Sequence, residues 1–357
     1  MFSQSVTGIM DDPALPALAQ ALDTERMLPV IAEVAGLHPQ DTAGLICDVQ
    51  LLNHKLGRRC TVRYTLTRAG AEGRPVNLAS VVGKVYDRPE SAERLYRRIE
   101  GLRSGPFNGA PSCIPAPMML VQDLGLVLQE YVDGADLRHA LSSANTEAPW
   151  ALAGHWLARL HLAPRLAGLR TASLEHELET ADRWCAHIAP HLGTADAGRL
   201  RRVLEARHRL ADEAPPHEPV MIHKDFYYGN VLWDGPRVWV LDFDELSIGD
   251  PALDVGHFLA HLETLACRTT GRADAFTQES ASFLGSYREE TSLDLESRLP
   301  FYKAYTFVKL AATEVSRKQS QWEQMARLLA DLACQAMDVQ FGRGSRARAA
   351  KKGCRVS

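Results

Sequence analysis

The amino-acid sequence predicts an α+β fold built from a small antiparallel sheet and a larger helical part. Between residues 45 and 131, short runs rich in β-branched and aromatic residues are separated by polar, glycine-containing turns, which is typical of antiparallel strands. After Gly134 the apolar residues recur mainly at helical spacing, with one strand-like interruption at 220–241. Because strands and helices are segregated along the chain, we expect a sheet lobe followed by a helical lobe.

The individual elements follow this plan in order. Strands are expected at 46–52, 60–66, 79–86, 118–122 and 126–131, and helices at 89–102, 152–162 and 200–211. The expected domains are a helical lead-in rich in proline (1–40), a sheet-containing N-lobe (41–133), a helical C-lobe (134–341) and a basic, disordered tail (342–357).

Composition excludes several classes of protein. The chain of 357 residues is 46% hydrophobic and 24% charged, as soluble globular proteins are, and its net charge of −4 gives no reason to expect a nucleic-acid partner. No apolar run approaches the roughly 20 residues that cross a bilayer, and the N-terminus lacks a signal-peptide pattern. The seven cysteines form no CxxC pair, which favours free thiols in a reducing compartment. We therefore expect a cytoplasmic protein that contacts neither nucleic acid nor membrane.

The most informative segment is the loop from His223 to Asn230. It follows an apolar strand at 219–222 and precedes another at 231–233. Asp225 and Asn230 therefore lie on a loop that is held at both ends.

More acidic groups follow the next apolar strand, at 238–241. This strand leads into Asp242, Phe243 and Asp244, and a Gly-Asp-Pro turn then precedes Asp254 at the start of a helix. Carboxylates placed after strands are held in defined positions, which is what binding or catalysis requires.

Phosphoryl transfer explains why these residue types occur together. Its transition state spreads negative charge over phosphoryl oxygens, so the protein must position groups and neutralise charge. Mg²⁺ prefers oxygen ligands, and Asp242 with Asn230 supplies a carboxylate and an amide. Asp225 is a separate carboxylate that can orient an acceptor hydroxyl as a general base.

The motif H-x-D-x-x-x-x-N at 223–230, the D-F-D at 242–244 and the G-D-P-x-x-D at 249–254 resemble the aminoglycoside phosphotransferase and choline kinase family, whose members are distant relatives of protein kinases. The resemblance covers most of the chain. It implies a bilobal protein-kinase-like fold, ATP or GTP as phosphoryl donor, Mg²⁺ as cofactor, and a small hydroxylated acceptor such as an aminoglycoside, a sugar or an amino alcohol.

The resemblance also implies roles for the residues of the motifs. Asp225 would be the catalytic base, and Asn230 and Asp242 the ligands of Mg²⁺. Asp254 would brace the catalytic loop through hydrogen bonds, and His223 is expected to be a structural histidine near that loop.

Nucleotide contacts are expected upstream, in the N-lobe. Lys84 on the third strand resembles the lysine that contacts the α- and β-phosphates, and an acidic residue of the next helix should hold it. Glu93 is the preferred partner, with Glu90 and Glu100 as alternatives. The segment 128–134 resembles the hinge between the lobes, whose backbone binds adenine, which assigns Glu130 and Val132 to the nucleotide site.

The sequence departs from the family pattern in three places. Lys224 stands where the family often has glycine. Asp244 replaces the glycine of D-F-G, and either helps to bind a second metal ion or faces solvent. No GxGxxG covers the first hairpin, so Arg58 or Arg59 either contacts phosphate or lies in a solvated turn.

Two interpretations outside the motif are weaker. His257 and His261 have the spacing of zinc ligands, but neither HExxH nor a third ligand accompanies them, which favours ordinary core or surface histidines. Tyr287, Glu289 and Glu290 are candidates for an acceptor pocket in the C-lobe.

The rival hypothesis is a nucleotide-binding pseudokinase that regulates a partner without catalysis. The missing glycine-rich loop supports it. The complete set of Asp225, Asn230 and Asp242 argues for catalysis.

Overall fold

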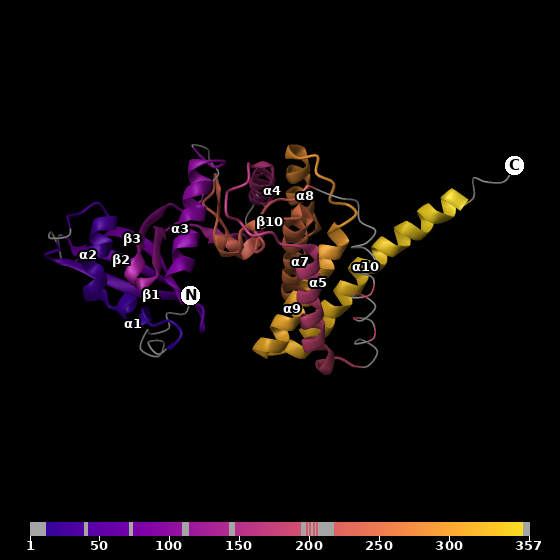
Figure 1. The fold of residues 1–357 in the computed structure, drawn as a ribbon, viewed down its shortest axis with the longest axis horizontal. Coiled ribbons are helices and arrows are strands. Elements are labelled where there is room, and N and C mark those ends of the chain that lie inside the picture. The colour runs from indigo at the N-terminus through magenta and orange to yellow at the C-terminus, as the bar shows by residue number, and fades with distance from the viewer. Residues whose placement is uncertain are drawn as a thin grey trace. The chain divides into compact units, whose positions relative to one another are not determined.

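The computed structural model describes residues 12–352 apart from 39–41, 71–73, 109–113, 143–146, 194–197 and most of 199–217, where only 200, 203 and 205 are described. For residues 142 and 338–352 it describes the backbone alone. The chain forms two compact units (Figure 1). Unit 1 contains the residues up to Gly134 together with Trp239–Asp244, and unit 2 contains Ala135–Val238 and the residues from Glu245 onward.

Unit 1 is built on a five-stranded sheet in the order β1-β2-β3-β5-β4, and all its neighbouring strands are antiparallel. Its elements are α1 (Leu18–Leu22), α2 (Thr24–Val34), β1 (Leu45–Lys55), β2 (Arg59–Ala69), β3 (Pro75–Tyr86), α3 (Pro89–Ser104), β4 (Pro117–Val121), the 3₁₀ helix η3 (Gln122–Leu124) and β5 (Leu126–Glu130).

The core of unit 1 lies between one face of this sheet and the helices α1 and α2. On β2, alternate residues are fully buried, as the two-residue period of a strand requires: Cys60, Val62, Tyr64 and Leu66. The Tyr64 hydroxyl donates to the Ala21 carbonyl at 2.6 Å and so ties the sheet to α1. A Cβ at Gly83 would stand 2.6 Å from the Tyr64 ring, so this position of β3 has room only for glycine.

Unit 2 is mainly helical. Its elements are β6 (Ala135–Asp136), η4 (Leu137–Ser142), α4 (Glu147–Leu162), α5 (Leu174–Ile188), η5 (Ala189–His191), β7 (Val220–Ile222), η6 (Tyr228–Asn230), β8 (Val231–Trp233), β10 (Ser247–Gly249), α7 (Pro251–Thr270), α8 (Thr277–Glu290), α9 (Leu299–Arg317) and α10 (Trp322–Lys352). β7 pairs with β10 and β6 with β8, both antiparallel. β9 (Val238–Val240) and η7 (Phe243–Glu245) lie where the chain passes between the units.

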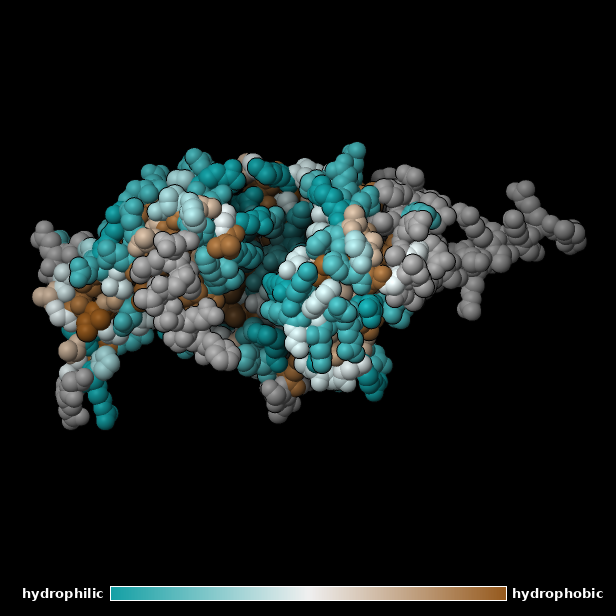
Figure 2. Space-filling model, turned by 90° about the horizontal axis from the view of Figure 1, so that it is seen from below, coloured by the Kyte–Doolittle hydropathy of each residue, from teal (hydrophilic) through white to brown (hydrophobic). Residues whose placement is uncertain are grey.

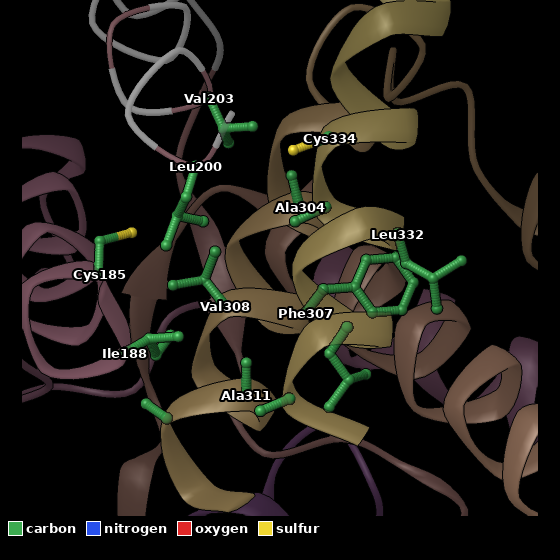
Figure 3. Packing of buried hydrophobic residues seen from close by; sticks show 14 of the residues in the cluster. Cys185, Ile188, Leu200, Val203, Ala304, Phe307, Val308, Ala311, Leu332 and Cys334 are labelled. Carbon is green, nitrogen blue, oxygen red and sulfur yellow. The ribbon is translucent and has the colours of Figure 1, made fainter. Parts of the chain in front are cut away.

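Two apolar clusters stabilise unit 2. Side chains of α5, α9 and α10 form the first, and Ile188, Val308 and Leu332 are among its members (Figure 3). In the second, Phe226 of the loop between β7 and β8 stacks on Trp156 at 5.8 Å and contacts Phe258 at 5.5 Å. The loop segment is therefore anchored in the helical core by an aromatic side chain next to Asp225.

The structure confirms the predicted α+β class, with a sheet unit that precedes a helical unit. The backbone of α10 continues to Lys352, so residues 342–352 are helical where the sequence predicted a disordered tail. Alanine, arginine and lysine are frequent there and have high helix propensity, which accounts for the difference. Most of the predicted helix at 200–211 lies outside the described residues.

The distribution of hydrophilic and hydrophobic residues is that of a folded protein with a buried apolar core. Hydrophilic residues predominate on the face in Figure 2, and hydrophobic residues are scattered among them. Among the helices of the described residues, none combines the length and the apolar character needed to span a membrane. The cysteines that the structure describes are buried thiols: Cys47, Cys60, Cys185, Cys267 and Cys334.

Candidate active site

Asp254, in the first turn of α7, fixes the loop between β7 and β8. The Asp254 carboxylate is fully buried and accepts hydrogen bonds from the backbone N–H groups of His223 at 2.6 Å and Lys224 at 2.7 Å. The backbone N–H of Asp225 donates to His223 Nδ1 at 3.3 Å. Asp254 and His223 thus hold the loop backbone directly before Asp225.

Asp254 has its own support from two other helices. His161 of α4 lies with Nε2 3.2 Å from the Asp254 carboxylate and with Nδ1 2.8 Å from the hydroxyl of Tyr287 in α8. Burial alone raises the pKa of Asp254, but the hydrogen bonds from His161 and His223 hold this pKa below its ordinary value. Tyr287 is fully buried here, so its assignment to the acceptor pocket is wrong.

The two glutamates assigned with Tyr287 lie on α8. Glu290 lies 3.0 Å from Nδ1 of His155 in α4, and its side chain is about half exposed (52%). Glu289 is also exposed.

Lys224 adopts a left-handed backbone conformation, with φ of 66°. Glycine enters this region without a steric penalty, which explains why a glycine suits this position. The Lys224 ammonium donates to Glu177 of α5 at 2.7 Å, and the hydroxyl of Tyr305 in α9 donates to the same carboxylate. The loop is thereby tied to two helices through a buried glutamate that the sequence analysis did not identify.

Replacing Glu177 with alanine should lower the free energy of unfolding by about 3 kcal/mol, because Lys224 and Tyr305 lose a shared, buried partner. It should also lower kcat, since Lys224 immediately precedes Asp225. Chemical denaturation and steady-state kinetics measure the two effects. The control is Glu179→Ala on the exposed side of the same helix, and equal behaviour of both variants would contradict the prediction.

Asp225 lies beside polar groups from three parts of unit 2. Its carboxylate accepts from the Asn230 amide nitrogen at 3.3 Å and from the ammonium of Lys309 in α9 at 3.3 Å. His257 Nε2 of α7 lies 3.4 Å from the same carboxylate. The Asn230 amide nitrogen also donates to the Asp225 backbone carbonyl at 2.9 Å. This orientation leaves the Asn230 carbonyl oxygen as the group that can bind a cation.

His257 and His261 form a buried pair with ring centroids 4.4 Å apart. Burial lowers the pKa of both imidazoles, and the positive charge of Lys309 lowers the pKa of His257 further. Both rings are therefore neutral near pH 7. His257 has its Nδ1 3.3 Å from the Thr306 hydroxyl, and His261 packs against Tyr227 at 4.4 Å, as core histidines do.

Unit 1 holds the second group of candidate residues, around Asp242 and Asp244. The Lys84 ammonium lies 3.2 Å from Asp242 and 3.3 Å from Asp244. Arg59 makes a two-pronged contact with Asp242, at 2.5 and 2.8 Å, and also binds Asp244. The Tyr86 hydroxyl donates to Asp244 at 2.5 Å. Two carboxylates and two cations are thus gathered in one largely buried cluster.

The two carboxylates of this cluster differ in their pKa values. Burial opposes ionisation of Asp242, but Lys84, Asp244 and Arg59 together hold its pKa well below the ordinary value. Burial raises the pKa of Asp244, and the neighbouring Asp242 acts in the same direction, against Lys84. Asp242 is therefore the more acidic of the two carboxyl groups. Asp244 contacts Arg59 and Tyr86, so it does not simply face solvent.

The predicted partner of Lys84 is wrong. Within the part of the chain that the structure describes, Lys84 forms no ion pair with Glu90, Glu93 or Glu100. Glu93 binds Arg97 one turn further along α3 at 2.5 Å, because the buried face of this helix lies at Ala92, Leu95, Ile99 and Leu102 and turns Glu93 away from the sheet. The residue of α3 that reaches the cluster is Arg98, which donates to the backbone carbonyls of Phe243 and Asp244.

The hinge residues lie at the end of the sheet. β5 ends at Glu130, whose backbone N–H and carboxylate both bind the backbone of Ala116, at 2.9 and 3.0 Å. The side chain of Glu130 is thus engaged by protein. Val132 follows as a buried residue. The assignment of the Glu130 and Val132 backbone groups to adenine binding stays a prediction.

The first hairpin turn is held without a glycine-rich motif. Gly57 has φ of +72°, and its backbone N–H donates to the Asp12 carboxylate at 2.7 Å. His54 Nε2 lies 2.9 Å from the same carboxylate. Asp12 therefore fixes the turn that precedes Arg59, and the Arg59 side chain is buried, so the solvated-turn interpretation of Arg59 is wrong.

The donor groups fit Mg²⁺ by their chemistry. Asp242 supplies an ionised carboxylate, and Asn230 supplies an amide oxygen whose orientation is set by the hydrogen bonds of its nitrogen to Asp225. Hard cations prefer such oxygen ligands. Within unit 1, Lys84 and Arg59 balance the charges of the two aspartates.

Comparison with solved structures defines the class of the fold. A microcompartment-associated aminopropanol kinase matches with a TM-score of 0.61 at 20% identity, over 83% of this chain and 93% of that chain. A thermostable mutant of the aminoglycoside phosphotransferase APH(4)-Ia matches with 0.54 at 15%, over 83% and 97%. A choline/ethanolamine kinase family protein from Mesorhizobium loti matches with 0.53 at 15%, over 81% and 87%. The chain has the bilobal, kinase-like α+β fold of these proteins.

The family follows from the sequence itself. The model of the phosphotransferase enzyme family matches residues 103–284, which is just over half of the chain and includes the loop at 223–230 and Asp254. The chain therefore belongs to the phosphotransferase enzyme family. No curated protein sequence matches it.

Proposed function

We propose that the protein transfers the γ-phosphoryl group of ATP or GTP to a hydroxyl group of a small molecule, with Mg²⁺ as cofactor. The observation that carries this proposal is the fixed position of Asp225, on a loop braced by Asp254 and by the Lys224–Glu177 pair. A carboxylate that is held so firmly, yet keeps about a quarter of its side chain exposed (27%), suits a group that must meet a substrate.

Each residue has one task in this proposal. Asp225 accepts a hydrogen bond from the acceptor hydroxyl and takes its proton during transfer. Lys84 binds phosphate oxygens, with Glu130 and Val132 as the adenine-binding segment. Asn230 and Asp242 hold Mg²⁺, which when bound neutralises charge on the phosphates. Asp244 supports Asp242 through the cations that both aspartates share.

The family and the fold neighbours support a class of acceptor. Two of the matching structures are described as an aminopropanol kinase and a choline/ethanolamine kinase family protein, and others as aminoglycoside phosphotransferases. We propose a hydroxylated metabolite or antibiotic as acceptor, with amino alcohols, sugars and amino sugars as the first candidates to screen.

Asp225→Asn should lower kcat by about 10²–10⁴-fold and change the affinity for Mg·ATP little, because the amide keeps the shape but cannot accept the hydroxyl proton. Acceptor-dependent ADP release across a library of hydroxylated metabolites and aminoglycosides measures turnover, and calorimetry measures Mg·ATP binding. Asp274→Asn, on an exposed loop of the same unit, is the control and should behave as wild type.

The same experiment distinguishes the catalytic proposal from the pseudokinase hypothesis. A pseudokinase binds Mg·ATP in both forms and releases no ADP with any acceptor. That result would overturn the catalytic proposal.

A further inference from the structure

We propose that Lys309 of α9 is a catalytic residue that stabilises negative charge on the phosphoryl group as it passes to the acceptor. The inference rests on the proposed function, because it takes Asp225 as the base. Its starting point is the ion pair between the Lys309 ammonium and Asp225 Oδ1, 3.3 Å apart.

This distance places Lys309 at the reacting atoms. A hydroxyl that donates to Asp225 lies about 2.6–3.2 Å from its carboxylate. The phosphorus attacked by that hydroxyl oxygen must lie on the far side of it. A lysine ammonium that already contacts the carboxylate reaches the oxygens of that phosphoryl group by rotation within its own flexible stem.

The ion pair is also open to a ligand. The Lys309 side chain is 33% exposed and that of Asp225 is 27% exposed. Ion pairs with this much exposure contribute little to folding stability, so the ammonium can exchange the carboxylate for a phosphoryl oxygen at small cost.

Two other basic residues near Asp225, Lys224 and His257, do not suit this role. The catalytic loop has a lysine of its own, Lys224, but Glu177 binds its ammonium at 2.7 Å. His257 stands 3.4 Å from Asp225, yet burial and Lys309 lower its pKa and keep it neutral. Lys309 therefore supplies a positive charge that neither of these two residues offers.

Helix α9 also holds Lys309 in a defined place. Tyr305, one turn earlier, donates to Glu177, and Thr306 contacts His257. Both side chains are buried and lie on the same side of α9 as Lys309, since residues three or four apart share a helix face. The helix is thus fixed to the catalytic loop and to α7 at the positions that aim Lys309 at Asp225.

The chemical step balances with these groups alone. The acceptor oxygen forms a bond to the γ-phosphorus while the bond from that phosphorus to the bridging oxygen breaks. The electron pair of the broken bond stays on the leaving nucleoside diphosphate, and the hydroxyl proton passes to Asp225. Lys309 keeps its protons and donates hydrogen bonds to the phosphoryl oxygens throughout.

Lys309→Met tests the inference directly. We expect kcat about 10²-fold lower, as for the loss of one preorganised donor to a transition state, with the KM values for nucleotide and acceptor changed less than about threefold. Lys309→Arg keeps the charge and should recover most of the loss. The melting temperature of both variants should stay within about 3 °C of wild type.

Lys303→Met is the matched control. Lys303 lies on another face of the same helix and forms an ion pair with Glu263 at 2.5 Å. Its replacement removes a comparable ammonium from α9 but leaves Asp225 untouched, so kcat should remain at the wild-type level. An equal loss in both variants would show a structural effect of α9 and overturn the inference.

A second measurement needs no knowledge of the acceptor. Aluminium fluoride with Mg·ADP imitates the phosphoryl group in transfer, so it should tighten ADP binding to wild type and to Lys303→Met. In Lys309→Met the binding of Mg·ADP should be unchanged and the tightening by aluminium fluoride about 10²-fold weaker.

The outcomes separate the two proposals. A wild-type protein that fails to bind Mg·ADP would refute the proposed function. If wild type turns over an acceptor and Lys309→Met retains both its kcat and the tightening by aluminium fluoride, only the role of Lys309 falls. A higher acceptor KM at unchanged kcat would likewise overturn it, because Lys309 would then bind the acceptor and not the phosphoryl group.

Discussion

Asp242→Ala is expected to abolish Mg²⁺-dependent turnover, with kcat/KM lower by at least about 10³-fold. In the proposed site Asp242 is the ionised ligand of the metal, and its low pKa depends on the adjacent cations Lys84 and Arg59. Alanine removes the carboxylate and leaves these two cations beside the phosphate site without their main counter-charge. The metal-dependent gain in nucleotide affinity should disappear with the activity.

Calorimetric titration of nucleotide with and without Mg²⁺, alongside ADP release, measures both effects. The control is Asp123→Ala, which removes an exposed carboxylate of the same unit that pairs with Arg26. Circular dichroism of the variant should show a folded protein, because Asp244 still binds Lys84 and Arg59. Near-normal Mg²⁺-dependent activity in Asp242→Ala would falsify the metal assignment.

Local patterns in the sequence were sufficient for the strands of unit 1 and for the loop at 223–230. Alternating residues such as those of β2 face the core on one side, and the apolar strands that flank residues 223–230 hold the loop at both ends. The relation between Asp254 and the loop was also predictable, since it came from a motif with fixed spacing. The hydrogen bonds from the His223 and Lys224 backbone to Asp254 agree with that expectation.

Side-chain direction on a helix was not predictable to one residue. Glu93 is five residues before Arg98 on α3, and a helix rotates by 100° per residue, so the two point in different directions. Only the packing of Leu95 and Ile99 decides which of them meets the D-F-D segment. The spacing of the apolar residues on α3 shows that Glu93 lies away from the buried face, but it does not show that Arg98 is the residue that reaches the D-F-D segment.

Contacts between residues far apart in the sequence could not be predicted, for another reason. Lys309 is 84 positions from Asp225, and Glu177 is 47 from Lys224. Neither pair belongs to a motif of fixed spacing, so a single sequence contains no pattern that joins them. Such pairs become visible once the helices α5 and α9 are placed against the loop.

Asp254→Ala is expected to have the largest effect on stability, lowering the free energy of unfolding by about 3–5 kcal/mol. The substitution leaves the buried N–H groups of His223 and Lys224 without an acceptor and removes the partner of His161. Asparagine at this position would not restore both hydrogen bonds, because its NH₂ group would face one of the two N–H donors. Since the same bonds hold the backbone before Asp225, kcat should also fall. Denaturant titration and steady-state kinetics measure the two quantities, and Asp274→Ala on the surface of the same unit should match wild type.

Acid should reproduce part of this effect in the wild-type protein. The folded-state pKa of Asp254 is lower than the ordinary value of 3.8, so the unfolded chain binds the proton more readily. The contribution of Asp254 to stability is therefore fully present above about pH 5 and is lost as the pH falls through 3.8 toward the lower folded-state pKa. Asp254→Ala lacks this group, so its unfolding free energy should depend less on pH between about 5 and 3 than that of wild type. Equal slopes for the two proteins over this range would show that the buried carboxylate is not the anionic brace of the catalytic loop.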